Sequence, residues 1–337
     1  MDLATVLPVA WFAVIGFGVL MYVLLDGFVL GLGILAPLAE DEDQRDLMMT
    51  TAAPIWDGNE TWLVLGGAGL MAAFPHAYAV VLSGLYLPVL AMLMGLVFRG
   101  VAFEFRFKAQ RSRPLWGMAF AAGSILAAFS QGVILGALVQ GLPVVDGQYV
   151  GGAFGWFGPF SMLTGAALVF GYALLGSGWL ILKTDGALQR TARIMARPLV
   201  VAVLVFMGLV SAWLPFLDSR LMARWFEHGN FWWLSPVPLL TLAVALALWR
   251  AAMDPRHDAR PFVLTLCFFG LGFAGLVVGM WPYLVPPSLT LWQAAAPLSS
   301  QGFTLVGLVV LLPVVLGYTA WSYRVFRGKV AAGSGYH

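Results

Sequence analysis

The sequence is poor in charged residues. Of its 337 residues, only 10% are Asp, Glu, Lys or Arg, whereas 61% are hydrophobic. The mean hydropathy is +0.88. A soluble domain carries roughly a quarter charged residues, so this chain has too few to cover a water-facing surface. The formal net charge of +2 gives no reason to expect a nucleic acid or another polyanion as a partner.

The sequence also has few residues that could hold a metal. Cys267 is its only cysteine, which excludes an internal disulfide, a paired-cysteine zinc site and a C-x-x-C-H haem attachment. None of the four histidines, His76, His228, His257 and His337, lies inside a long apolar run. A membrane-embedded haem would need axial ligands there. We therefore predict no haem ligand and no metal site in this chain.

The chain does contain long, continuous apolar runs. They reach the length of about 20 residues that a helix needs to cross a bilayer, whereas barrel strands would alternate over about ten residues. We expect an all-α integral membrane protein in which residues 1–337 form a single membrane domain. Nine transmembrane helices are predicted, at 9–37, 55–75, 77–103, 115–140, 158–183, 198–217, 236–253, 262–285 and 302–325.

The basic residues predict the orientation. With nine spans, the opposite side of the membrane holds only Arg220 and Arg224. Because positive residues concentrate on the cytoplasmic side, we expect a periplasmic N-terminus and a cytoplasmic C-terminus. An eight-span chain would break this pattern. The residues on the predicted cytoplasmic side are Arg106, Lys108, Arg111, Arg113, Lys183, Arg190, Arg193, Arg197, Arg250, Arg256, Arg260, Arg324, Arg327 and Lys329.

Four acidic residues lie within the predicted spans or at their ends. Asp26 is in the first span, Asp57 and Glu60 open the second, and Glu104 ends the third. An ionised group at the bilayer centre costs about 2.5–3.5 kcal/mol on insertion scales, so such residues are functional candidates. The second half of the chain has no acidic residue at depth. Asp57 and Glu60 are three residues apart and should share a helix face.

The third span also carries Arg99, and a buried arginine requires a carboxylate partner. Asp57, Glu60 or Glu104 could each supply that partner. The residues support two interpretations equally. In the first, a polar file runs from the cytoplasm by way of Asp57 and Glu60 toward Asp26 and carries protons. In the second, the same side chains form a structural ion-pair cluster that fixes the register of the helices.

Two weaker features predict close helix packing. Gly27 and Gly31 form a small-xxx-small face in the first span, and Gln131 lies in the middle of the fourth. Small residues allow membrane helices to approach closely, and a buried glutamine makes interhelical hydrogen bonds.

Several stretches resemble subunit II of the cytochrome bd quinol oxidases. The similarity covers nearly the whole chain, in the same order, and the short chain is similar to the cyanide-insensitive branch of that family. The matching stretches are Asp26-Gly27-Phe28, WDGNETWL (56–63), FRGVAFEFR (98–106), WPYLVPPS (281–288) and YTAWSYRVFRGKV (318–330).

The resemblance implies a heterodimer in the bacterial inner membrane, to which a small accessory subunit can be added. Each subunit would have two four-helix bundles and a peripheral helix, here 9–140, 158–285 and 302–325. Subunit I would carry three haems and the quinol-oxidising loop. The complex would oxidise quinol, reduce O2 to water and take its protons from the cytoplasm.

The resemblance also implies roles for individual residues. An acid at the position of Asp57 belongs to a proton path toward the haems of subunit I, and Asn59 lies in the same polar stretch. A quinone is bound near the positions of Trp56 and Arg99. The family commonly reads DGFD, whereas residues 26–29 of this chain read DGFV. Any role that requires a carboxylate at the position of Val29 is therefore in doubt.

Two other classes of protein are compatible with such a composition. The first is a proton-coupled secondary transporter, in which acids at depth couple protons to a substrate. Transporters of this kind repeat their broken helices in both halves, whereas here the acids lie in one half only. The second is a structural membrane subunit that supports assembly and no more.

Overall fold

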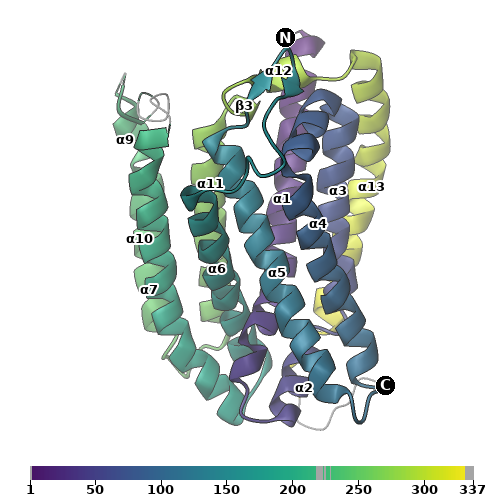
Figure 1. The fold of residues 1–337 in the computed structure, drawn as a ribbon. Coiled ribbons are helices and arrows are strands. Elements are labelled where there is room, and N and C mark those ends of the chain that lie inside the picture. The colour runs from purple at the N-terminus through teal and green to yellow at the C-terminus, as the bar shows by residue number, and fades with distance from the viewer. Residues whose placement is uncertain (1, 218–222, 224, 228, 331–337) are drawn as a thin grey trace.

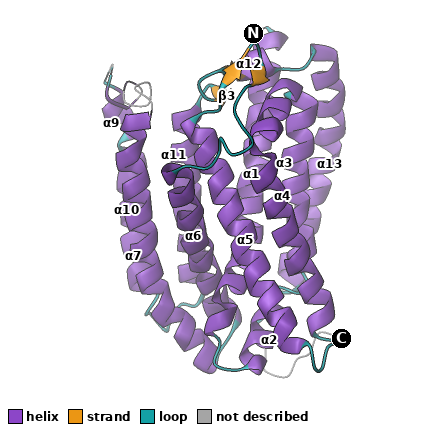
Figure 2. Ribbon diagram, viewed as in Figure 1, coloured by secondary structure: helices purple, strands orange, loops and turns teal. Residues whose placement is uncertain are grey.

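The computed structural model describes residues 2–217, 223, 225–227 and 229–330, and helices dominate it (Figures 1 and 2). Two short antiparallel hairpins, β1 (Val144–Val145) with β2 (Gln148–Tyr149) and β3 (Tyr283–Val285) with β4 (Leu289–Thr290), join helices. The helices are α1 (Leu3–Leu35), the 3-10 turn η1 (Ala36–Leu38), α2 (Glu42–Thr50), α3 (Trp56–Ala73), α4 (Pro75–Arg106), α5 (Arg113–Gln140), α6 (Pro159–Lys183), α7 (Gly186–Leu217), α9 (Asn230–Leu234), α10 (Pro236–Ala251), α11 (Ala259–Met280), α12 (Leu291–Ala294) and α13 (Leu298–Val325).

Within the described residues, 8 helices are long and apolar enough to cross a membrane. The predicted second span, α3, is not among them, because its first turns carry Asp57, Asn59 and Glu60. It nevertheless packs against α1, α4 and α13 inside the helix array (Figure 1). A ninth crossing therefore depends on α3, and the count of nine stays a prediction.

Three predicted boundaries are wrong. Helix α1 begins at Leu3 rather than residue 9, and α7 begins at Gly186 rather than residue 198. The basic residues Arg190, Arg193 and Arg197 consequently lie on a helix and not in a loop. Helix α11 ends at Met280 rather than residue 285, because the following residues form the β3–β4 hairpin. Hydropathy alone misses the start of α7 because its first turns, with Gln189, Arg190 and Arg193, are polar and extend beyond the apolar run.

Helix α1 lies in the middle of the array and packs against α3, α5 and α6. Helix α4 covers α5, whereas α7 and α11 pack on α6 and α10 packs on α11. In Figure 1, α7 and α10 stand at one edge and α3, α4 and α13 at the other. The first and second halves of the chain therefore meet along α1, α5 and α6. The predicted division into bundles at 9–140 and 158–285 stays a prediction.

Glycines allow α1 and α6 to touch through their backbones. A Cβ atom on Gly31 would lie 1.9 Å from the carbonyl oxygen of Tyr172, and one on Gly176 would lie 2.5 Å from the Gly31 carbonyl carbon. Gly27 faces the Tyr172 ring in the same way, at 2.8 Å. The predicted packing face of Gly27 and Gly31 is thus confirmed, and its partner is α6.

Several basic segments come together at the end of the array that holds α2 (Figure 1). Lys329, just after α13, pairs with Asp185 at 2.5 Å and with Asp258 at 2.6 Å. Arg193 of α7 also pairs with Asp258, at 2.5 Å. These contacts join the α6–α7 turn, the α10–α11 turn and the segment after α13 on one side. Arg220 and Arg224, predicted for the opposite side, lie outside the described residues.

Candidate functional site

Arg99 is the centre of a buried ion cluster built from three helices. Its guanidinium, wholly buried, donates from Nη1 to Oδ1 of Asp26 at 2.5 Å. Nη2 donates to Oε1 of Glu60. The Asp26 side chain on α1 is also fully buried, whereas the Glu60 side chain on α3 is 31% exposed. The cluster therefore connects the interior of the helix array with its surface.

The other two predicted carboxylates stay outside this cluster. Asp57 is exposed on the first turn of α3, although Glu60 is only three residues further along. Glu104 is exposed on α4 and faces Lys108 at 3.8 Å. Of the three partners predicted for Arg99, only Glu60 is confirmed, and the second partner is Asp26. Asp26 was not among the predicted partners of Arg99, and its contact joins α1 to α4.

Trp56 lies beside the cluster in a crowded position. Its ring stacks on Phe103, with centroids 5.1 Å apart and planes 2° apart. The Arg99 guanidinium carbon lies 5.7 Å from the ring centroid, and a Cβ on Gly100 would lie 3.3 Å from the ring. Both terminal nitrogens of Arg99 are already engaged by carboxylates. This arrangement leaves no room for a quinone ring between Trp56 and Arg99, and a quinone near these residues stays a prediction.

Asn59 ties α3 to two neighbouring helices. Its Nδ2 donates to the backbone carbonyl of Leu25 at 2.8 Å, one residue before Asp26 on α1. Its Oδ1 accepts from the Tyr323 hydroxyl on α13 at 3.0 Å. A cavity of about 20 Å³ beside this pair is lined by Asn59, Tyr323, Ser322 and Thr319 among others. That volume is enough for one water molecule, since a single water needs roughly 10–15 Å³.

A second polar chain crosses the array next to Asp26. Gln131 on α5 donates from Nε2 to the Tyr22 hydroxyl at 2.8 Å and accepts from the Tyr172 hydroxyl at 2.7 Å. Tyr22 is on α1, one turn before Asp26, and Tyr172 is on α6. The interhelical hydrogen bond predicted for Gln131 is confirmed. The two tyrosines were not singled out from the sequence, because tyrosine in a membrane span usually signals no more than an interface.

Two atoms of the ion cluster lack a hydrogen-bond partner among the described residues. They are Oδ2 of Asp26 and Nε of Arg99, both fully buried. Buried polar atoms are satisfied in most proteins, by protein groups or by ordered water. A carboxylate oxygen without a donor is the kind of atom that a proton or a water molecule satisfies.

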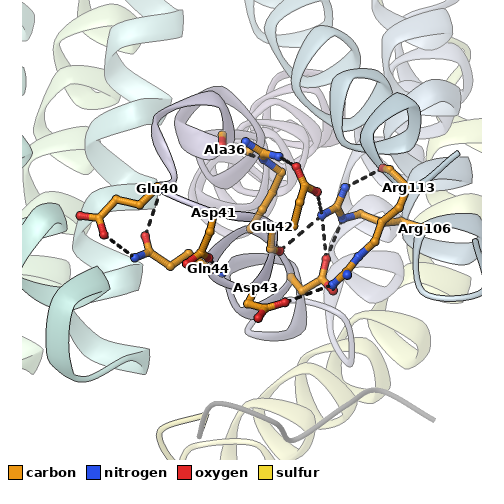
Figure 3. A network of polar contacts seen from close by, with 10 residues as sticks. Ala36, Glu40, Asp41, Glu42, Asp43, Gln44, Arg106 and Arg113 are labelled. Atoms are coloured by element: carbon orange, nitrogen blue, oxygen red, sulfur yellow. Dashed lines mark hydrogen bonds and ion pairs between the residues drawn. The ribbon is translucent and has the colours of Figure 1, made fainter. Parts of the chain in front are cut away.

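A separate ion network holds α2 against the α4–α5 turn (Figure 3). The buried Arg106 donates to Asp46 at 2.8 Å, to Glu42 at 2.6 Å and to the carbonyl of Arg113 at 2.7 Å. Arg113 in turn pairs with Asp46, and with Asp43 at 3.6 Å. The hydrogen bond from Arg106 lowers the pKa of Glu42 below its ordinary value.

These acids and bases are about 60 residues apart in the sequence, and no local pattern pairs them. The fold pairs them, because α2 lies across the end of α4. Because Arg106 and Arg113 form ion pairs with acids of α2, they are not available to other anions.

The two described histidines lie at opposite ends of the array. His76 in the first turn of α4 contacts the Gly147 carbonyl at 2.6 Å, and His257 in the α10–α11 turn contacts Asp254 at 3.0 Å. His228 and His337 lie outside the described residues. Among the residues that the structure describes, no three potential metal ligands come together. The predicted absence of haem ligands stays a prediction.

The arrangement defines a multi-pass helical membrane protein with a charged site near one end of its helices. Residues 7–326 match the model of the family described as cytochrome bd terminal oxidase subunit II. The chain belongs to this family.

Relatives of known name agree with this assignment. The cytochrome bd-I ubiquinol oxidase subunit 2 of Escherichia coli K12 is 29% identical over 363 residues, which cover 96% of this chain and 95% of the relative. The cytochrome bd ubiquinol oxidase subunit 2 of Bacillus subtilis 168 is 30% identical over 336 residues, covering 95% and 96%.

Among solved structures, a chain of the bd oxidase from Geobacillus thermodenitrificans has the same fold. The TM-score is 0.79 at 16% sequence identity, with 95% of this chain and 98% of that chain covered. Similarity to the cyanide-insensitive branch stays a prediction.

Proposed function

We propose that this chain is the second subunit of a quinol:O2 oxidoreductase complex in the bacterial inner membrane. The relatives from E. coli and B. subtilis are named as subunits of ubiquinol oxidases and match over nearly their whole length. A haem-bearing subunit I is the partner, quinol and O2 are the substrates of the complex, and a small accessory subunit can join it. The chain contributes two four-helix bundles, 9–140 and 158–285, with 302–325 as the peripheral helix.

Within this complex, the ion cluster takes up protons from the cytoplasmic side for the reduction of O2. The observation that carries this role is the bridge made by Arg99 between a fully buried and a partly exposed carboxylate. Asp57 stands one turn before Glu60, or about 4.5 Å nearer the start of α3, and is exposed. The order from the surface inward is then Asp57, Glu60, Arg99 and Asp26.

The charges of the cluster suit proton uptake. Arginine stays protonated, so Arg99 balances one of its two carboxylates and leaves the other with an uncompensated charge. Uncompensated charge in a low-dielectric interior favours binding of a proton. Glu60 can exchange that proton with the surface, and the free Oδ2 of Asp26 can accept it further inside. The cation holds both acids in position, and one bound proton brings the net charge of the three side chains to zero.

The structural interpretation of the same cluster differs in one respect. An ion pair that only fixes helix register needs Asp26 and Arg99 but has no use for a second, partly exposed carboxylate. A transporter would need comparable groups in the second half, and the described part of α6, α7, α10 and α11 has no acid between its helix ends.

The test is to replace Glu60 by glutamine in the assembled complex. Glu60→Gln keeps the side chain's shape and a hydrogen bond to Arg99 but removes the exchangeable proton. We expect quinol-driven O2 uptake to fall at least about tenfold, since a positioned acid or base contributes about 10²–10⁴ to rate. Asp57→Asn should lower O2 uptake less, because Asp57 is at the exposed start of the path. The measurements are O2 consumption and haem content of the purified complex.

Glu104→Gln is the matched control, because Glu104 is exposed on α4 and its carboxylate pairs with Lys108 and not with the ion cluster. It should leave O2 uptake unchanged. If Glu60→Gln gave normal uptake at normal haem content, the proton role would be wrong and a structural cluster would remain. If the chain purified without any haem-bearing partner, the assignment to an oxidase complex itself would fail.

A further inference from the structure

An apolar groove of about 310 Å³ lies between α4 and α5. Its walls include Phe98 from α4 and Leu115, Met118, Ala122 and Leu126 from α5. These side chains are not covered by the rest of the chain; Phe98 is 48% exposed and Met118 is 62% exposed. The groove is therefore a hollow on the outer surface of the array and not part of its packed core.

Gly123 of α5 lies at the floor of the groove. A Cβ atom on Gly123 would lie 2.6 Å from the Gly95 carbonyl oxygen, so the backbones of α4 and α5 touch there. Because glycine has no side chain, the close approach leaves a depression between the larger residues on each side. The depression is thus a consequence of helix packing and does not depend on flexible side chains.

The length of the groove matches one leaflet of a bilayer. Leu115 lies in the first turn of α5 and Leu126 lies three turns further. At 1.5 Å per residue this is about 16 Å, close to half of a hydrocarbon core of about 30 Å. The groove runs from the end of the array that holds α2 toward the middle of the membrane, as one acyl chain would.

Positively charged residues lie at the end of the groove next to the α4–α5 turn. Four basic residues lie at the α4–α5 turn, but Arg106 and Arg113 are paired with acids of α2 (Figure 3). Lys108 faces Glu104 at 3.8 Å, and both side chains are largely exposed, at 79% and 60%. Exposed pairs of this kind are weak. Arg111 is exposed and has no ion pair among the described residues. Two cations at headgroup level therefore remain open to an external anion.

We infer that the α4–α5 groove binds an anionic phospholipid, with one acyl chain along the groove and the phosphate held by Lys108 and Arg111. The acyl chain fills a hollow that no side chain of this subunit fills. The two cations select for negative charge, because basic residues near a membrane surface attract anionic lipids over zwitterionic ones. The site would give the subunit a fixed lipid at its cytoplasmic edge.

The test measures lipid binding to the delipidated, detergent-purified complex by native mass spectrometry. Phosphatidylglycerol and phosphatidylcholine with identical acyl chains are titrated separately. We expect one tightly bound phosphatidylglycerol and a weaker phosphatidylcholine. The double variant Lys108→Gln/Arg111→Gln should lose about 25-fold in its preference for phosphatidylglycerol, about fivefold for each cation, with phosphatidylcholine binding unchanged.

Two further variants test the groove itself. Ala122→Phe places a ring in the groove and should abolish the tight binding of phosphatidylglycerol and the weaker binding of phosphatidylcholine. Ala243→Phe, at an exposed alanine of α10, is its matched control and should change neither. Arg250→Gln, which removes an exposed cation at the end of α10, is the control for charge.

Several outcomes would overturn the inference. Equal affinity of the unaltered complex for the two lipids would remove the charge argument. Undiminished tight binding in Ala122→Phe would remove the groove. Loss of a co-purifying quinone in that variant, without loss of phospholipid, would assign the groove to an isoprenoid tail. The double variant changes only exposed side chains, so it decides the charge argument even if Ala122→Phe prevents assembly.

Discussion

The helices before the β1–β2 hairpin and those after it differ in where they keep their charges. In the first half, Asp26, Arg99 and Glu60 meet inside the helix array, on α1, α4 and α3. In the second half, the buried cations Lys183 and Arg193 lie beside helix ends, where they bind backbone carbonyls and Asp258.

This difference separates two uses of charge. An ion pair at a helix end is close to water, so little desolvation is needed and its role is to join segments. Inside the array, Asp26 and Arg99 lose their hydration completely, which a fold tolerates only when the groups compensate one another. A polar group kept at such a cost is a candidate for function. The first half is therefore where we place the proposed proton uptake, and the second half packs against it.

The difference between the two halves is tested most strongly by removing the positive charge of Arg99. Arg99→Gln leaves two carboxylates without their counter-ion, and breaking a buried pair costs about 3–5 kcal/mol. We expect little or no assembled complex, measured as haem absorbance in membranes. Arg260→Gln is the control from the second half, since Arg260 is 59% exposed and lies 3.8 Å from Asp254. Equal accumulation of the two variants would contradict the difference between the halves.

A substitution at the α1–α6 contact, where the two halves meet, should have an intermediate effect on stability. Gly31→Ala puts a methyl group within 1.9 Å of the Tyr172 carbonyl oxygen, so α1 and α6 must separate. Overpacking of this kind costs about 1–3 kcal/mol. The thermal midpoint of the purified complex should fall by several degrees. Gly208→Ala on α7, where no atom lies within 4 Å, should leave the midpoint unchanged or slightly raised. If both variants behaved alike, the two halves would not depend on this contact.

The smallest effect is expected where α13 meets the first half. Tyr323→Phe removes the hydroxyl that donates to Asn59 and keeps the ring. One lost hydrogen bond costs about 1 kcal/mol, so the thermal midpoint should fall by a few degrees at most. Tyr318→Phe, at a tyrosine that is 63% exposed, should not change it. A large loss of O2 uptake in Tyr323→Phe at normal stability would instead make Tyr323 part of the proton path.

Much of this could be predicted from the sequence. The apolar runs gave most helices to within a few residues, because hydropathy reports directly on which segments avoid water. The charged loops predicted a common side for the basic residues, and the ion pairs of Lys329 and Arg193 agree. The acids Asp26, Asp57 and Glu60 were identified because charge in an apolar run is rare.

What the sequence left open is which of these groups touch. Arg99 had three candidate partners on local grounds, and only one is correct. Asp57 and Glu60 share a helix face by spacing, yet the neighbouring helices cover one and not the other. The acids of α2 and Arg106 are far apart in the sequence, and only the fold brings them into contact.

The amino-acid sequence determined the class of this protein, its helices and the residue types that cost free energy in a membrane, because these follow from local hydropathy and composition. The tertiary structure alone decided the pairing of Asp26 with Arg99, the contact of Gly31 with α6 and the groove between α4 and α5. Each of these depends on how helices far apart in the chain are rotated against one another, and rotation is set by packing around all sides at once.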